Sequence, residues 1–192
     1  KRMFPVYKQL KDLLDGSTIH FEVNGSNWGL ACNSIHFIDL VAMCTGDLQY
    51  DLDFSNLDSV IHLSKRDGFI ELTGTIQGKF SSGHTFSFSS SVGKVVILSQ
   101  KVQTDKMKID FNENEGKVIV FDQVKDEKTI IPYEHIHQSK LTHKVAKELF
   151  EAGSCQLPSY EESMTLHLPL IQNCIHFLEQ LKGEPVLRCP IT

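Results

Sequence analysis

The stretch FIELTGTIQGKFSSGHTFSFSSS, residues 69–91, contains two short runs of β-forming residues separated by a Ser-Ser-Gly turn signal. In the second run, Phe86 and Phe88 alternate with serine and threonine. A period of two places the aromatic rings on one face of a strand and the hydroxyl groups on the other. The stretch therefore predicts strands of a sheet that is buried on one face and wet on the other.

Similar runs occur on both sides of this stretch, from about residue 59 to about residue 133. They read SVIHLS, KVVILSQ, KMKIDFNE and GKVIVFDQ, with turn signals at residues 65–68, 93 and 113–116. Such short connections leave no room for crossover helices, so neighbouring strands must be mostly antiparallel. We predict one sheet of about six strands here, and the run TIHFEVNG at residues 18–25 predicts a further strand.

Helical patterns flank the β-forming region. Ser159 followed by Glu162 is a capping box for the last helix, which Pro169 is expected to bend or divide. Residues 1–192 are therefore predicted to form a single α+β domain, with a largely antiparallel open-faced sheet and helices packed on one face. The predicted helices occupy residues 4–15, 29–45, 139–152 and 159–181.

The composition restricts the classes of function. The chain has 192 residues and a formal net charge of -5, whereas a nucleic-acid binder presents a basic stripe. The longest apolar run, residues 35–43, is too short to span a bilayer and contains Asp39. We therefore expect neither nucleic acid nor a membrane as a partner. Because the chain starts at Lys1 rather than at a methionine, we expect it to belong to a longer protein.

The cysteines and histidines do not form a recognisable metal motif. Five cysteines show no C-x-x-C spacing, which favours free thiols in a reducing cytoplasm over a structural zinc site. His135, His137 and His143 are close in sequence, but no carboxylate or cysteine pattern around them is typical of a metal site. We predict no bound metal and a cytoplasmic location.

The predicted helix at residues 29–45 is apolar yet carries Cys32, Asn33, His36 and Asp39 on neighbouring turns. A histidine on such a helix is ordinarily a hydrogen-bonded core residue. Alternatively, this side of the helix lines a pocket, since positions 32 and 36 are one turn apart. A histidine there can exchange protons, because its ordinary pKa lies near neutrality.

The segment GLACNSIHFIDLVAMCTG, residues 29–46, resembles part of the glucose–fructose oxidoreductase / inositol dehydrogenase-like family, which reads roughly G-x-L-x-D-x-x-x-H-x-x-D before an apolar helix and a glycine. His36 matches the histidine of this motif, Asp39 the aspartate after it, and Gly29 and Leu30 its entry. RMFPVYKQLKDLL, residues 2–14, resembles the segment after the cofactor domain of that family. The resemblance covers nearly the whole chain, as the C-terminal domain of such an enzyme.

This resemblance implies a nicotinamide-dependent oxidoreductase acting on a hydroxyl group of a sugar or sugar nucleotide. An N-terminal Rossmann domain, absent from residues 1–192, would bind NAD or NADP, so this fragment alone should hold no cofactor and be inactive. His36 would exchange a proton with the substrate hydroxyl. The chain would supply the substrate pocket, and partly exposed Phe, Val and Ile side chains on the open face of the sheet would form a homo-oligomer.

The family commonly has an aspartate where this sequence has Cys32, and a thiol cannot hold a hydroxyl group as a carboxylate does. Asn33 is a candidate to share that role. Asp39 either binds substrate or pairs with a buried polar group that holds His36. The other substrate-binding candidates are Trp28, which otherwise belongs to the core, and Asn27, which otherwise caps the helix.

A rival hypothesis from a different class is a non-catalytic binding or assembly domain with a vestigial pocket. The cysteine at position 32 and the lack of any G-x-G-x-x-G or Glu-Lys-Pro motif favour it for this fragment. The retained His36 and Asp39 favour an enzyme. The sequence immediately before Lys1 would discriminate, because a glycine-rich turn after a strand would identify a dinucleotide-binding domain.

Overall fold

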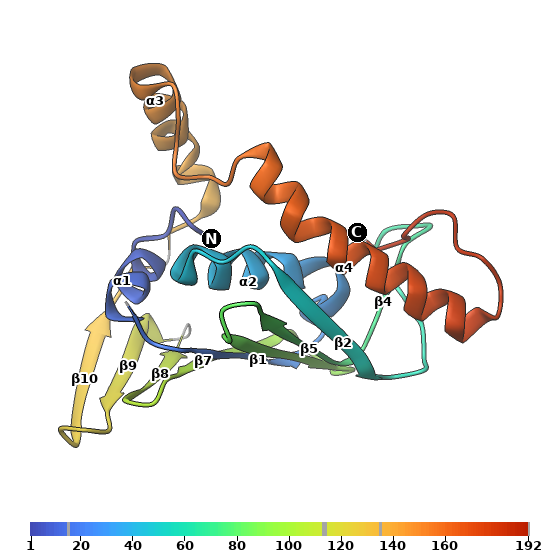
Figure 1. Ribbon diagram of the computed structural model, residues 1–192, viewed down its shortest axis with the longest axis horizontal. Coiled ribbons are helices and arrows are strands. Elements are labelled where there is room, and N and C mark those ends of the chain that lie inside the picture. The colour runs from blue at the N-terminus through green and yellow to red at the C-terminus, as the bar shows by residue number, and fades with distance from the viewer. Residues whose placement is uncertain (15, 113–114, 135, 192) are drawn as a thin grey trace.

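The computed structural model describes residues 1–14, 16–112, 115–134 and 136–191. Its centre is an eight-stranded sheet in the order β10-β9-β8-β7-β1-β6-β5-β2, with helices over one face (Figure 1). Among the described strands of this sheet, β1 and β6 pair in parallel and the remaining neighbours are antiparallel. The predicted class, α+β with a largely antiparallel open-faced sheet, is confirmed. The strands are β1 (His20–Ser26), β2 (Tyr50–Leu57), β5 (Gly74–Phe80), β6 (Thr85–Ser91), β7 (Ile97–Gln103), β8 (Met107–Asn112), β9 (Lys117–Asp122) and β10 (Glu127–Pro132).

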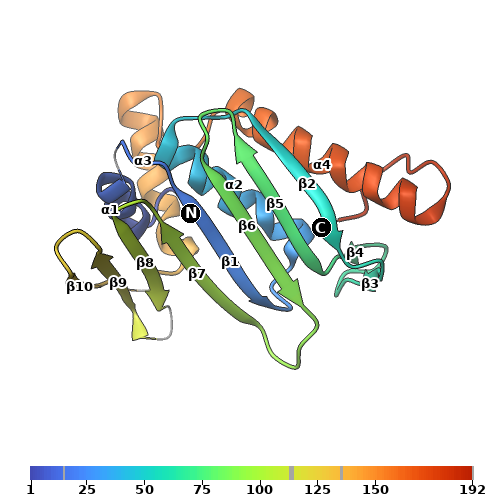
Figure 2. The ribbon, with the colours of Figure 1, turned by 60° about the horizontal axis from the view of Figure 1, so that its bottom comes forward.

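Most of the sheet comes from the region that the alternating pattern predicted, but two parts differ. The runs at residues 59–64 and 69–71 do not join the main sheet: β3 (His62–Leu63) and β4 (Ile70–Glu71) form a separate hairpin at its side (Figure 2). Strand β2 was not predicted, although Tyr50 and Phe54 alternate with acidic residues there. The predicted turn at residues 113–116 lies partly outside the described residues.

Three helices cover one face of the sheet: α1 (Pro5–Leu14), α2 (Leu30–Thr45) and α4 (Tyr160–Lys182) (Figure 1). Helix α3 (Thr142–Ala152), preceded by a 3-10 turn (Gln138–Lys140), stands away from the sheet, and none of its described residues is buried. The expectation that all helices pack on the sheet is therefore wrong for α3. No helix within the described ranges is long and apolar enough to cross a membrane.

The last helix begins as its sequence predicts. The Ser159 hydroxyl accepts a hydrogen bond from the Glu162 backbone N–H, and the Glu162 carboxylate accepts one from the Ser159 N–H. Pro169 lies inside α4 without dividing it. A capping box of this kind stabilises a helix start by about 1 kcal/mol.

The core lies between the sheet and α2. Phe21 of β1 and Phe88 of β6 meet Phe37 of α2, and these side chains and Phe86 are no more than 2% exposed. Phe86 and Phe88 stack with ring centroids 4.6 Å apart. Burial of each such ring contributes roughly 1.5–3 kcal/mol. These rings fix the middle of α2 against the first half of β1 and of β6.

The face of the sheet that the helices leave open is turned toward the viewer in Figure 2. Outward positions on the central strands carry side chains such as Glu22, Ser87 and Lys101. Of the apolar side chains expected to be exposed on this face, Ile97 of β7 is 55% exposed on the same side of the strand as Lys101. In the described part of the chain, Ile119 and Phe121 of β9 are partly exposed at one side of the face.

Candidate functional site

An open cavity of about 690 Å³ lies where β1 and β6 end. Because these strands are parallel neighbours, their carboxyl ends reach the same edge of the sheet, beside the start of α2 (Figure 2). Four segments line the cavity: residues 27–29, the first two turns of α2, the β3–β4 hairpin with residue 73, and residues 90–96 at the end of β6. The volume is within the range of small-molecule sites.

Gly29 precedes α2 with a φ of 79°, a left-handed conformation that favours glycine. Its missing side chain leaves room for polar groups: a β-carbon there would lie 2.7 Å from Asn33 Nδ2, 2.8 Å from Cys32 Sγ and 3.3 Å from Glu71 Oε2. Asn33 Nδ2 donates to the Trp28 carbonyl at 2.6 Å, which fixes the amide against the wall. Polar atoms from α2 and β4 therefore converge at one point of the cavity.

Glu71 is a site residue that the sequence analysis did not identify. Its Oε1 accepts hydrogen bonds from the backbone N–H groups of Ala31, at 2.7 Å, and Leu72, at 2.9 Å. Its Oε2 lies 3.6 Å from Cys32 Sγ. Because helix N-termini have unpaired N–H groups and a positive dipole end, this carboxylate stabilises the start of α2.

His36 is exposed and lines the cavity together with Cys32 and Asn33. This is the position predicted for a pocket histidine, and it rules out a fully enclosed core histidine. Loss of hydration at the wall lowers the pKa of His36 below its ordinary value, and the positive charge of the Lys1 side chain acts in the same direction. Asp39 acts in the opposite direction but does not outweigh them. At neutral pH the imidazole is therefore uncharged and able to accept a proton.

A second histidine, His62, lies on the hairpin side of the same cavity. The Thr73 hydroxyl donates to Asp58 Oδ2 at 2.6 Å, and His62 Nε2 lies 3.2 Å from that hydroxyl oxygen. Because the hydroxyl proton is directed to Asp58, the Thr73 oxygen is the acceptor for an N–H on His62 Nε2. This chain of hydrogen bonds orients His62, which the sequence analysis also missed.

The mouth of the cavity is cationic and partly apolar. Lys65, Arg66 and Lys94 line it, whereas Glu71 is the one acidic side chain among the described lining residues. The adjacent valines of residues 92–96 are more than 60% exposed. This distribution of charge favours a polar ligand with an anionic group near the mouth.

The two candidates before α2 have mixed roles. Trp28 is 6% exposed, packs edge to face on Phe37 with centroids 5.6 Å apart, and donates from Nε1 to the Ser89 carbonyl at 2.8 Å. It is a core residue whose edge reaches the cavity. Asn27 is not the N-cap, because its side chain exchanges hydrogen bonds with the backbone of Gly93 across the cavity mouth.

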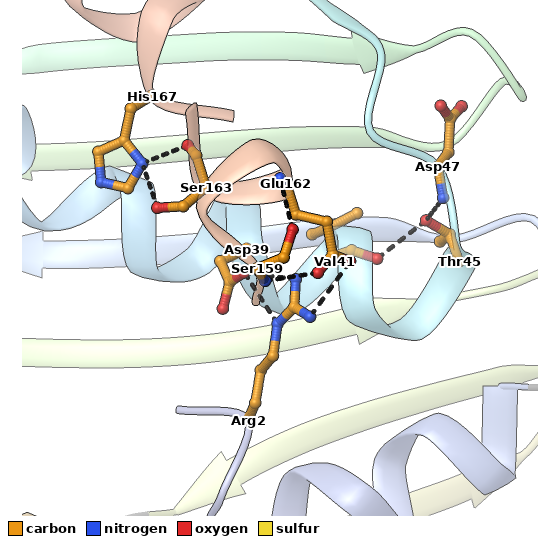
Figure 3. A network of polar contacts seen from close by, with 9 residues as sticks. All are labelled: Arg2, Asp39, Val41, Thr45, Asp47, Ser159, Glu162, Ser163 and His167. Carbon is orange, nitrogen blue, oxygen red and sulfur yellow. Dashed lines mark hydrogen bonds and ion pairs between the residues drawn. The ribbon is translucent and has the colours of Figure 1, made fainter. Parts of the chain in front are cut away.

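Asp39 does not line the cavity among the described residues; it belongs to a polar network with Arg2 and Glu162, about two turns further along α2 than Cys32 (Figure 3). Its Oδ1 accepts from Arg2 Nε at 2.9 Å and lies 2.7 Å from Arg2 Nη2. Arg2 Nη1 also lies 3.7 Å from Glu162 Oε1 at the start of α4. The ion pair with Arg2 fits the alternative that Asp39 pairs with a buried polar group, and the contact of Asp39 with substrate stays a prediction.

No group of three or more His, Cys, Asp or Glu side chains in the described ranges is arranged to hold a metal ion. His135, one of the three clustered histidines, lies outside those ranges. All five cysteines are free thiols.

Comparison with known proteins identifies the fold. No family model matches the sequence, and no curated protein matches it. Solved structures do match: UDP-N-acetylglucosamine 3-dehydrogenase GnnA from Acidithiobacillus ferrooxidans has a TM-score of 0.66 at 11% identity, covering 88% of this chain and 57% of that one. Levoglucosan dehydrogenase in complex with NADH and levoglucosan has a TM-score of 0.57 at 11% identity, covering 100% and 65%.

A putative NADPH-dependent oxidoreductase from Desulfitobacterium hafniense also matches, with a TM-score of 0.60 at 13% identity over 88% of this chain and 59% of that one. The chain thus spans less than two thirds of the length of these structures. It shares the fold of part of these oxidoreductase structures, and the predicted resemblance is confirmed at the level of the fold.

Proposed function

We propose that residues 1–192 form the C-terminal, substrate-binding domain of an NAD- or NADP-dependent oxidoreductase that acts on a hydroxyl group of a sugar or sugar nucleotide. The observation that carries this proposal is the exposed His36, with its lowered pKa, on the wall of a sugar-sized cavity. The fold shared with dehydrogenases of levoglucosan and of UDP-N-acetylglucosamine supports the substrate class.

In this proposal His36 is the general base. The neutral imidazole accepts the proton of the substrate hydroxyl while the carbon that bears it is oxidised, and it returns the proton in the reverse direction. The polar atoms around Gly29 bind other hydroxyl groups and orient the sugar. Lys65, Arg66 and Lys94 lie where the diphosphate of a sugar nucleotide would leave the cavity.

The nicotinamide cofactor is proposed to bind mainly outside residues 1–192, because the sequence has no G-x-G-x-x-G turn to hold its diphosphate. When bound, the oxidised nicotinamide accepts a hydride from the substrate carbon. A preceding Rossmann domain would fit beside the cavity mouth, where Val92, Val95 and Val96 are exposed. Subunit contacts through the open sheet face remain part of the proposal; where the face is polar, they would depend on hydrogen bonds and ion pairs.

The experiment is a turnover assay of the full-length protein with NAD or NADP and two sugars, levoglucosan and UDP-N-acetylglucosamine, followed by cofactor absorbance. We expect His36→Ala to lower turnover by about 10²–10⁴-fold, the usual effect of losing a general base. Its free energy of unfolding should change by less than about 0.5 kcal/mol, because the side chain is exposed. The control is His176→Ala, which removes an exposed histidine on α4 far from the cavity lining.

Full turnover in His36→Ala would exclude the general-base role. If neither sugar is oxidised by the full-length wild-type protein, and neither binds, the sugar class is wrong and the rival hypothesis of an assembly domain with a vestigial pocket gains support.

A further inference from the structure

Glu71 is anchored in a way that leaves one of its oxygens for a ligand. Oε1 is committed to two backbone N–H groups, those of Ala31 and Leu72. One bond comes from the first turn of α2 and the other from Leu72, the residue directly after β4, and together they fix the plane of the carboxylate. A carboxylate oxygen has about two lone-pair directions, so Oε2 keeps accepting capacity beside its long contact with Cys32 Sγ, at 3.6 Å.

The Cys32, Asn33 and Glu71 side chains fill the space that a side chain on residue 29 would need, and all three border the cavity. A β-carbon on Gly29 would lie 3.3 Å from Oε2 and closer still to Cys32 Sγ and Asn33 Nδ2. Gly29, Cys32, Asn33 and Glu71 all line the cavity. An atom of a ligand that enters the cavity here therefore meets a fixed carboxylate oxygen.

Such an oxygen selects for hydroxyl groups. A carboxylate accepts a hydrogen bond from an alcohol O–H, and charge-assisted bonds of this kind are about twice as strong as neutral ones. An anionic ligand group would instead be repelled here, and it finds its cationic partners at the mouth, on Lys65, Arg66 and Lys94. The inner end of the cavity, at Glu71, thus favours a hydroxyl group, and the mouth favours an anionic group.

We propose that Glu71 binds a sugar hydroxyl and positions the ring against His36, the role for which Cys32 is unsuited. This inference rests on the proposed function, since it assumes that a polyol enters the cavity. It assigns to β4 a specificity residue that lies outside the helix motif. Glu71 is a binding and positioning residue, and the proton transfer is left to His36.

The test uses Trp28, the single tryptophan of residues 1–192, whose edge lines the cavity. Any tryptophan outside residues 1–192 is replaced by phenylalanine in every variant tested. The full-length protein is titrated with levoglucosan, myo-inositol, glucose and UDP-N-acetylglucosamine, and Trp28 fluorescence is recorded. Glu71→Gln is the informative variant, because the glutamine Oε1 can accept both backbone bonds while an N–H₂ group replaces Oε2. Glu127→Gln, on the exposed strand β10, is the control.

We expect Glu71→Gln to weaken binding of the responsive sugar by about 10- to 100-fold, as the loss of a charge-assisted hydrogen bond predicts. The melting temperature should fall by no more than about 4 °C, because glutamine keeps both backbone bonds and loses only the attraction between the charge and the helix dipole. The affinity penalty should vanish for the monodeoxy analogue that lacks the bound hydroxyl. This last readout separates ligand binding from a merely structural cap.

Equal affinity of wild type and Glu71→Gln overturns the inference and leaves the proposed function standing. An affinity loss that is the same for every deoxy analogue also overturns it, because the effect is then indirect. If no sugar in the panel changes Trp28 fluorescence or binds by calorimetry, the proposed function fails and this inference fails with it.

Discussion

Asp39→Ala is the substitution that best separates a structural aspartate from a substrate-binding one. The Arg2 and Asp39 side chains are only 10% and 18% exposed, and two guanidinium nitrogens lie within 2.9 Å of Asp39 Oδ1. Removing one partner of a buried pair leaves the other charge uncompensated, at a cost of about 3–5 kcal/mol. Because Glu162 Oε1 remains 3.7 Å from Arg2, we expect a loss near the lower limit, about 3 kcal/mol.

Thermal and urea unfolding measure this loss. For a chain of this size, about 3 kcal/mol corresponds to a decrease in melting temperature of about 6–12 °C. The double variant Arg2→Met with Asp39→Ala should be less destabilised than the sum of the single variants by at least about 1.5 kcal/mol, because the two residues interact directly. Sugar binding, followed by Trp28 fluorescence, should not change.

Two results would refute this reasoning. A loss in Asp39→Ala of less than about 1 kcal/mol would show that the network around Arg2 contributes no more than an exposed ion pair. Unchanged stability together with tenfold weaker sugar binding would return Asp39 to the substrate-binding role that its place in the sequence motif suggested.

The remaining predictions concern the two ends of α2. Gly29→Ala should destabilise the protein by about 1–3 kcal/mol and abolish sugar binding, because the new methyl group would displace the side chains around it. The control is Gly46→Ala, which has a similar φ of 74° and no atom near its β-carbon; it should cause backbone strain without affecting the Trp28 titration. Equal sugar binding in both variants would contradict the role of the close contacts around Gly29. At the other end, desolvation raises the pKa of Asp47, but hydrogen bonds from Ser82, Gln49 and Ser81 outweigh it and hold the pKa well below its usual value. A folded-state pKa below the unfolded one means that this stabilisation is present above about pH 4 and is lost as the pH falls through the folded value. The difference in urea midpoint between wild type and Asp47→Asn should therefore shrink at acid pH, and a constant difference would exclude the effect.

The alternating pattern predicted the strands well because one face of each is buried by helices. Phe86 and Phe88 point inward as their spacing requires, and both are at most 1% exposed. The order of the strands was not predictable in the same way. Strand β1 enters between β6 and β7, which are far from it in sequence, and only packing of α2 on the completed sheet selects that position.

The local sequence pattern gave a wrong prediction where it did not show whether another element covers an apolar stripe. Leu149 of α3 has the four-residue spacing of a buried stripe, yet it is 48% exposed, because α3 stands away from the sheet. Strand β2 shows the reverse error. Its acidic residues resemble a loop, but the Tyr50 hydroxyl donates to the Leu166 carbonyl and Phe54 packs on Phe177, so α4 covers the apolar side of this edge strand.

The residues of the candidate site also fall into those that a local pattern predicted and those that it could not predict. His36, Cys32 and Asn33 share one helix, so their spacing alone placed them on one wall. Glu71 is 39 residues away from Cys32, on a two-residue strand, and no periodicity connects the two. A hydrogen bond from a substrate hydroxyl depends on the position of the acceptor oxygen in space and not on its place in the sequence. A carboxylate lost from the helix at position 32 can therefore be supplied by β4, provided that backbone N–H groups hold it in place and that residue 29 stays a glycine. On this reasoning the cysteine in the motif is evidence for a rearranged sugar site and not, by itself, for a vestigial one.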